Sequence, residues 1–268
     1  MHRGITLTTD FGIRQGSQSV LHGVIYGICP EAAITDLTHE VTPFDVGEAG
    51  FLLGVNTPWF PAGTVHVAIV DPGVGTDRRP VALEVGEHRY VGPDNGVFSW
   101  VLHRADHAGM PWRAIHLNEP RYWLDDVSST FHGRDLFAPV AAYLACGATL
   151  DQVGEPIDDV VRRPIPGATR DGEDVVGEVI YIDPFGSAIC SVLPDDVAHL
   201  DGNYDVELCG ETTERTVRTF GESDLGPDRL ITLWDSSGYL LVTENNGVGG
   251  RVISPAPGDP VRVRPRPS

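Results

Sequence analysis

A carboxylate and an arginine seven positions apart, Asp71 and Arg78, could hold and activate a water molecule. Asp71 follows residues 64–69, Thr-Val-His-Val-Ala-Ile, a β-branched run that predicts a buried strand. Residues 72–75, Pro-Gly-Val-Gly, then predict a turn whose backbone N–H groups can approach a ligand closely. A carboxylate beside a guanidinium stays ionised and oriented. Taken alone, the stretch fits a strand-ending turn with a surface ion pair equally well.

A second polar stretch, residues 128–135 (Ser-Ser-Thr-Phe-His-Gly-Arg-Asp), precedes an apolar run and places His132 beside a glycine. An imidazole in such a turn can accept or donate a proton near neutral pH. The structural alternative for His132 is a helix cap or a hydrogen-bonded core histidine.

The first part of the chain alternates between expected strands and helices, which implies an α/β layer structure. Ser17 is the expected N-cap of the first helix, and Pro30 ends it. In this arrangement Asp71 lies at the carboxyl edge of a sheet, where such sheets bind ligands. Strands are expected at residues 5–9, 33–37, 64–69, 81–85, 89–91 and 114–117, and helices at 17–28, 45–55, 97–103 and 136–147.

The pattern changes after residues 162–167, Arg-Arg-Pro-Ile-Pro-Gly, which read as a linker. Short expected strands then follow one another, separated by Gly, Pro, Asn and Asp, which is typical of a small barrel or sandwich. We therefore predict an α/β domain with a central mixed sheet at 1–163 and an all-β, barrel-like domain at 169–268. The strands of the second domain are expected at 175–182, 204–208, 215–219, 230–234, 239–242 and 261–263.

Composition excludes several classes of function. The net charge of −19 over 268 residues disfavours binding to nucleic acid or to an anionic membrane. No apolar run approaches the ~20 residues of a membrane span and no signal-peptide pattern begins the chain, so a cytoplasmic protein is expected. There is no P-loop or dinucleotide fingerprint. The four cysteines show no CxxC spacing, so reduced, buried thiols are expected rather than a zinc site or disulfides: Cys29, Cys146, Cys190 and Cys209.

Seven short motifs, in order along nearly the whole chain, resemble one family: the S-adenosylmethionine (SAM) hydroxide adenosyltransferases, relatives of the SAM-dependent fluorinase and chlorinase. Each motif is weak alone, but seven in sequence make coincidence improbable. They are Thr-Asp-Phe-Gly at 9–12, Thr-Pro at 42–43, Asp-Pro-Gly-Val-Gly-Thr at 71–76, Pro-Asp-Asn-Gly at 93–96, Phe-His-Gly-Arg-Asp at 131–135, Ile-Asp-Pro-Phe-Gly at 182–186 and Asp-Ser-Ser-Gly-Tyr-Leu at 235–240.

The resemblance implies a homotrimer in which SAM lies between the N-terminal domain of one subunit and the C-terminal domain of its neighbour. It implies displacement of methionine at the ribose C5′ by water, giving adenosine and L-methionine, with SAM as substrate and neither cofactor nor metal. It also implies a catalytic set of Asp71, Arg78 and His132 around the attacking water. Arg79 is the alternative arginine, and Arg78 is chosen by its spacing from Asp71.

The resemblance also implies contacts to the rest of the substrate. Asp10 matches a carboxylate that holds the ribose hydroxyls, and Phe44 an aromatic residue that lines the sugar. Asp183 matches the residue that receives the methionine ammonium, and Ser236 could reach its carboxylate. Four further positions border the nucleophile pocket or flank the base: Thr130, Gly133, Phe185 and Phe220.

Three departures from the family pattern affect these contacts. Residues 14–19 lack the usual second acid and Tyr-Val pair, Ser187 replaces a common asparagine in the predicted substrate site, and Glu244-Asn245-Asn246 replaces the residues that read the adenine edge. A halogenase on the same scaffold is the main alternative. Asp71 argues against it, because a carboxylate repels a halide and strengthens water as a competitor. A catalytically idle SAM- or nucleoside-binding protein is the other alternative.

Overall fold

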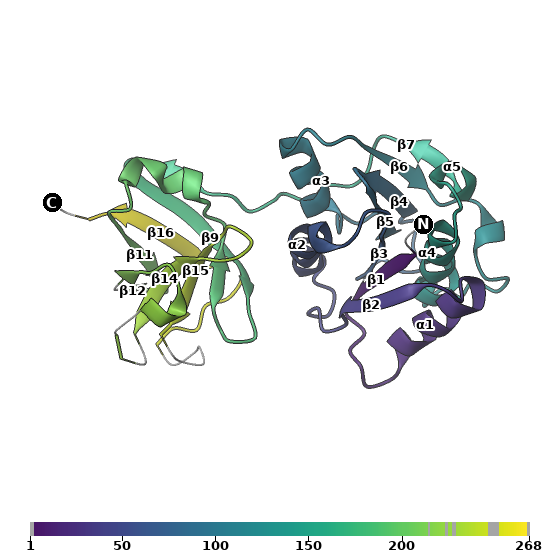
Figure 1. Cartoon of the computed structure of the whole chain (residues 1–268), viewed down its shortest axis with the longest axis horizontal. Coiled ribbons are helices and arrows are strands. Elements are labelled where there is room, and N and C mark those ends of the chain that lie inside the picture. Colours follow the sequence, from purple (N-terminus) through teal and green to yellow (C-terminus); the bar gives the residue numbers. More distant parts are fainter. Residues whose placement is uncertain (1–2, 214, 223–224, 227–228, 246–251, 267–268) are drawn as a thin grey trace. The chain divides into compact units, whose positions relative to one another are not determined.

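The computed structural model describes residues 3–213, 215–222, 225–226, 229–245 and 252–266. The chain divides into two compact units, residues 1–165 and 166–268 (Figure 1). Among the described residues, no helix has the length and apolar character that crossing a membrane requires.

The first unit contains a seven-stranded mixed sheet in the order β2-β1-β3-β5-β4-β6-β7. The first four strands in this order are parallel, and the other three join by antiparallel pairing. Every residue of β1 and β3 is buried, as expected for strands covered on both faces. The strands are β1 (Gly4–Thr9), β2 (Ala33–Thr38), β3 (Val65–Ile69), β4 (Pro80–Val85), β5 (His88–Pro93), β6 (Trp112–His116) and β7 (Glu155–Ile157).

Helices cover both faces of this sheet (Figure 1). The apolar residues of α1, α4 and α5 form one core cluster with β1 and β3, and those of α2 and α3 form another on the opposite face. A π-helix leads directly into α4, and short 3₁₀ helices occupy Thr57–Trp59 and Pro120–Tyr122. The helices are α1 (Ser17–Ile28), α2 (Val46–Asn56), α3 (Ser99–His107), the π-helix (Gly133–Phe137), α4 (Ala138–Ala145) and α5 (Leu150–Val153).

The second unit is a curled, mostly antiparallel nine-stranded sheet in the order β12-β11-β16-β9-β10-β15-β14-β13, with β8 beside β9. Burial alternates along β9 and β11, so one face of the curled sheet encloses a core of Val, Leu and Ile. Two 3₁₀ helices lie at Pro194–Leu200 and Phe220–Glu222. The strands are β8 (Thr169–Asp171), β9 (Asp174–Ile182), β10 (Ala188–Cys190), β11 (Tyr204–Leu208), β12 (Glu211–Thr212), β13 (Arg215–Thr216), β14 (Leu230–Trp234), β15 (Leu240–Glu244) and β16 (Pro260–Pro265).

Three local expectations are wrong. The thiol of Cys209, expected to be buried, is exposed. Ser17 does not cap α1: it is the first helical residue, and the capping position is Gly16 in a left-handed conformation (φ 77°). Cys29 and Cys146 are not separate thiols but form a disulfide bond, with Cα atoms 5.9 Å apart. The two cysteines are 117 positions apart, and they meet because α1 and α4 pack together and each helix ends at one of them.

Candidate active site

Two carboxylates lie at the same edge of the first sheet because they follow neighbouring parallel strands. Thr9, the last residue of β1, is in register with Ile69, the last residue of β3. Asp10 follows Thr9 directly, and Asp71 comes two residues after Ile69. The carboxyl ends of parallel strands form the ligand-binding edge of open α/β sheets. The strands therefore deliver both acids to one such edge.

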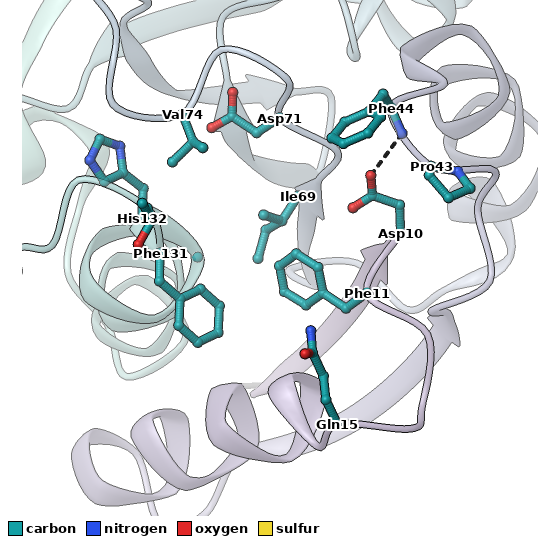
Figure 2. A pocket seen from close by; sticks show the side chains of 12 residues that line it. Asp10, Phe11, Gln15, Pro43, Phe44, Ile69, Asp71, Val74, Phe131 and His132 are labelled. Carbon is teal, nitrogen blue, oxygen red and sulfur yellow. Dashed lines mark hydrogen bonds between the residues drawn. The ribbon is translucent and has the colours of Figure 1, made fainter.

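A cavity of about 280 Å³ opens at this edge (Figure 2). Figure 2 shows Asp10 and Phe44 on one side of it and His132 on the other, with Asp71 between them. Small-molecule pockets begin at about 300 Å³, so the cavity suits a small ligand or one part of a larger one. Its wall includes six residues that the sequence assigns to the site: Asp10, Phe44, Asp71, Thr130, His132 and Gly133.

Arg78 connects the two other predicted catalytic side chains. Its Nε lies 3.0 and 2.9 Å from the two carboxylate oxygens of Asp71, and its Nη2 also donates to that carboxylate. The same Nη2 is 2.9 Å from Nδ1 of His132. The side chains of Arg78 and Asp71 are only 9% and 5% exposed, and the guanidinium lies over the ring of Phe137. Charge-assisted bonds of this kind fix the orientation of all three groups.

Arg79 points to different partners. Its guanidinium donates to Asp94, at 2.6 and 3.1 Å, and to the side chain of Asp159 at 2.7 Å. Asp94 is buried and also accepts the N–H of Val161, so this pair ties the end of the first unit to β5. Arg78 is thus the arginine that contacts Asp71.

Two glycines allow close packing between the loop that follows Asp71 and the turn that contains His132. Gly75 has a positive φ of 76°, and a Cβ atom there would lie 2.3 Å from the carbonyl oxygen of Ser129. A Cβ on Gly133 would lie 3.2 Å from Ile69, at the base of the cavity. Only glycine fits the first position without displacing backbone. The loop of Asp71 and the turn of His132 therefore form one continuous wall.

Arg78 also determines the protonated form of the His132 ring. A guanidinium has only N–H donors, so Nδ1 must accept the hydrogen bond and carries no proton. Burial, and next the positive charge of Arg78, lower the pKa of His132 below its ordinary value, although Asp71 and Asp135 act in the opposite direction. At neutral pH the ring is therefore neutral, with its proton on Nε2. His132 presents a hydrogen-bond donor there rather than a base.

The Asp10 carboxylate is positioned by the backbone of the segment before α2. Its Oδ2 accepts the N–H of Phe44 at 2.9 Å (Figure 2). Phe44 has a left-handed φ of 69°, rare for a residue with a side chain, and its side chain is among the exposed large hydrophobic ones at 69%. A strained backbone and an exposed aromatic ring at the mouth of a cavity are both common at ligand-binding sites.

The remaining predicted contacts belong to the second unit. Asp183, in the turn between β9 and β10, accepts the N–H groups of Phe185 and Ser187 at 2.9 and 2.8 Å. Phe185 and Phe220 are exposed, at 71% and 55%, whereas the hydroxyl of Ser187 is buried against that of Thr243. The turn therefore displays Phe185 and conceals Ser187.

Ser236 and Asp183 are not brought together within the second unit. Ala188, which follows the Asp183 turn, pairs with Val242, whereas Leu240, which follows the Ser236 turn, pairs with Cys190. The two turns thus lie at opposite ends of the β10–β15 pair.

Both parts of the chain match models of one family. Residues 5–154 match the N-terminal domain of the SAM hydroxide adenosyltransferases, and residues 177–262 match the C-terminal domain. The chain belongs to this family.

Within the SAM hydroxide adenosyltransferase family, several relatives are similar over three quarters of their length or more. The "(R)-S-adenosyl-L-methionine hydrolase" of Salinispora tropica is 38% identical over 262 residues, which cover 97% of each chain. The protein of the same name from Thermus thermophilus is 36% identical over 97% of this chain and 99% of its own. The "Fluorinase" of Nocardia brasiliensis is 28% identical over 76% of each chain.

The fold is also similar to solved structures. A crystal structure of an uncharacterised conserved protein from Thermotoga maritima has a TM-score of 0.89 and 32% identity, and the match covers 97% of this chain and 99% of that one. A conserved hypothetical protein from Thermus thermophilus has a TM-score of 0.76 at 32% identity, covering 98% and 100%.

Sequence reasoning missed half of the cavity wall in this SAM hydroxide adenosyltransferase. Three of the six missed residues adjoin a predicted one in the chain, and two more lie within three positions of Asp71, so proximity in the sequence was the available signal. Gln15 lies instead in the segment that departs from the family pattern. Of the departing C-terminal residues, Asn246 lies outside the described part of the chain. The missed wall residues are Phe11, Gln15, Pro43, Ile69, Val74 and Phe131.

Proposed function

We propose that this protein is a SAM hydrolase: water displaces L-methionine at the ribose C5′ of SAM, and the products are adenosine and L-methionine. The observation that carries the proposal is the hydrogen-bonded unit in which Arg78 joins Asp71 and His132 at the cavity. Membership of the family supports it, as do the names of relatives at 36–38% identity.

The chemistry needs little more than a positioned water. The sulfonium of SAM is already a good leaving group, so no acid has to expel it. The water oxygen attacks C5′, the C5′–S bond breaks with its electron pair going to sulfur, and the water loses a proton. Holding that water in line with C5′ supplies much of the rate enhancement. The proposed reaction requires no cofactor.

The hydrogen bonds at the site assign different roles to its members. Asp71 is the proton acceptor, because a carboxylate keeps further lone pairs after accepting from Arg78. His132 carries its proton on Nε2 and donates to the water oxygen, which orients the lone pair that attacks. Arg78 fixes both groups and offsets the negative charge that develops on the water.

Asp10 and Phe44 are the proposed ribose contacts. A carboxylate is acceptor-only, and Asp10 keeps an oxygen, Oδ1, besides the one that accepts the Phe44 N–H, so it suits the two vicinal hydroxyls of a ribose. The exposed ring of Phe44 can lie against the sugar. Thr130 and Gly133 border the water-binding end of the cavity.

We further propose a cytoplasmic homotrimer in which the second unit, a barrel, completes the site of a neighbouring subunit. Its contribution would be Asp183 and the exposed rings of Phe185 and Phe220, for the methionine ammonium and the base. Ser236 would reach the methionine carboxylate, and Ser187 would support the Asp183 turn from within. The exposed Phe44 and the small cavity volume support a site that a second surface completes.

The decisive experiment is turnover of SAM in halide-free buffer made with ¹⁸O-water. The sample should contain both epimers at sulfur, because the relatives' names specify the (R) form. We expect adenosine that carries ¹⁸O at the 5′ oxygen, and a loss of turnover of ~10²–10⁴-fold in Asp71→Asn.

A parallel reaction in saturating chloride or fluoride tests the halogenase alternative. A 5′-halogenated nucleoside as the main product would contradict the proposal. Absence of any product, with SAM bound, would indicate a binding protein instead.

A further inference from the structure

Three side chains with metal-binding atoms meet outside the cavity, behind the end of β1. His22 projects from α1, Asp36 lies on β2, and His39 follows that strand. Nε2 of His22 is 2.7 Å from Oδ1 of Asp36, and Nε2 of His39 is 3.0 Å from the same oxygen. All three ligand atoms lie within 4.8 Å of one another. None of the three residues is part of the proposed reaction.

His39 turns a buried ring nitrogen toward the cluster. Its side chain is only 4% exposed, and its Nδ1 bonds to the hydroxyl of Thr9 at 2.9 Å. Its Nε2 faces the cluster but, within the described part of the chain, is not aligned for a hydrogen bond with any partner. A cation in the cluster would give Nε2 a partner.

We propose that His22, Asp36 and His39 bind a divalent transition-metal ion, with Zn²⁺ the best match. Two imidazoles and one carboxylate form a common zinc ligand set, and water takes the fourth position. Bonds of about 2.0–2.2 Å keep any two ligands of one zinc within about 4 Å of each other. The cluster meets that limit after small rotations of His22 and Asp36, whose side chains are 29% and 40% exposed.

The surroundings resemble those of a metal site. The Nδ1 of His39 is held by Thr9, whose oxygen also accepts the N–H of Phe11 at 3.2 Å, so the ring is oriented from behind as metal-bound histidines are.

The alternative is a hydrogen-bonded cluster that binds no ion. In that case, His22 would donate to Asp36 and the cluster would only join α1 to β2. The two arrangements differ in how they respond to Zn²⁺.

The test is calorimetric titration of the full-length, chelator-treated protein with Zn²⁺, followed by Co²⁺ substitution and visible spectroscopy. We expect a single Zn²⁺ per chain and a Co²⁺ spectrum with nitrogen and oxygen ligands. His22→Gln and Asp36→Asn should each weaken binding at least ~100-fold, the upper end of what loss of a mere supporting residue produces. His22 is partly exposed, so His22→Gln should fold even if Asp36→Asn does not.

His107→Gln is the matched control. His107 lies one helical turn from His103 on α3, with ring centroids 4.1 Å apart. These two histidines are another place where an adventitious metal ion could bind. We expect it to leave the affinity unchanged. No binding by the wild-type protein, or binding that survives His22→Gln, would overturn the proposal.

Discussion

Arg78 and Arg79 are neighbours in the chain but serve different carboxylates, so they offer a matched pair of variants. Arg78→Gln removes the donor that holds Asp71 and His132, and we expect turnover to fall ~10²–10³-fold, as when one preorganised donor is lost. Arg79→Gln leaves that unit intact and should keep turnover within a few-fold. It should instead lower the free energy of unfolding by about 1–3 kcal/mol, because Asp94 is buried.

Steady-state kinetics and denaturant unfolding of both purified variants check this division. Equal losses of turnover in the two variants, or full activity in Arg78→Gln, would contradict it.

The lowered pKa of His132 predicts the acid side of the pH–rate profile. The neutral ring accepts the Arg78 hydrogen bond, whereas the protonated ring cannot and is repelled by that charge. Because the folded-state pKa lies below the ordinary value of about 6.5, kcat should hold through neutral pH and fall only at more acidic pH. His132→Asn offers an amide oxygen near the place of Nδ1 and should flatten this limb. An acid limb centred above the ordinary value would contradict the assignment.

Sequence reasoning could single out Asp71 and His132 because each lies in a short motif beside a turn, and Arg78 because of its spacing from Asp71. It could not predict the His22–Asp36–His39 cluster, because its members come from three segments and only the packing of α1 against β2 brings them together.

The disulfide is the main element-scale feature that the cysteine spacing did not predict. It joins the ends of α1 and α4 across 117 positions, and closing a loop of this length in the unfolded chain is worth about 4–5 kcal/mol. We expect the Cys29→Ala/Cys146→Ala variant to lose up to that free energy of unfolding, and a reductant to lower the stability of the wild-type protein similarly.

Cys209→Ser is the control, because this exposed thiol is free. Thiol titration of the unfolded, unreduced protein should find two thiols, Cys190 and Cys209. Four titratable thiols would show that the bond does not form.

Most elements of the first unit could be predicted from periodicity, because long buried strands and amphipathic helices leave strong patterns. The expected strands at 5–9 and 64–69 correspond to β1 and β3, and the helix at 17–28 has the bounds of α1. The hydrophobic pattern did not predict β7, β8 or β10. Each is three residues long, which is too short to show an alternation of apolar and polar residues. Their strand conformation depends on the neighbouring strands with which they pair.

At the scale of the whole molecule, the proposed trimer predicts complementation between inactive variants. Asp71→Asn damages the first unit and Asp183→Ala the second. If each site combines units of two subunits, mixed trimers contain some sites with two intact halves, and part of the activity should return after co-refolding. Light scattering of each variant is the control for assembly. A fully active monomer, or no recovery in verified mixed trimers, would contradict the proposal.

The pairing of Asp71 with Arg78 also has an electrostatic consequence for the whole catalytic cycle. These two charges cancel, and no ion pair links Asp10 to a cation among the described residues, so the cavity wall carries a net negative charge inside a protein of charge −19. SAM has a net positive charge, whereas adenosine and zwitterionic methionine have none. Added salt should therefore lower kcat/KM through weaker attraction of the substrate, while inhibition by adenosine should stay independent of ionic strength. The protein's field draws the substrate in and does not retain either product.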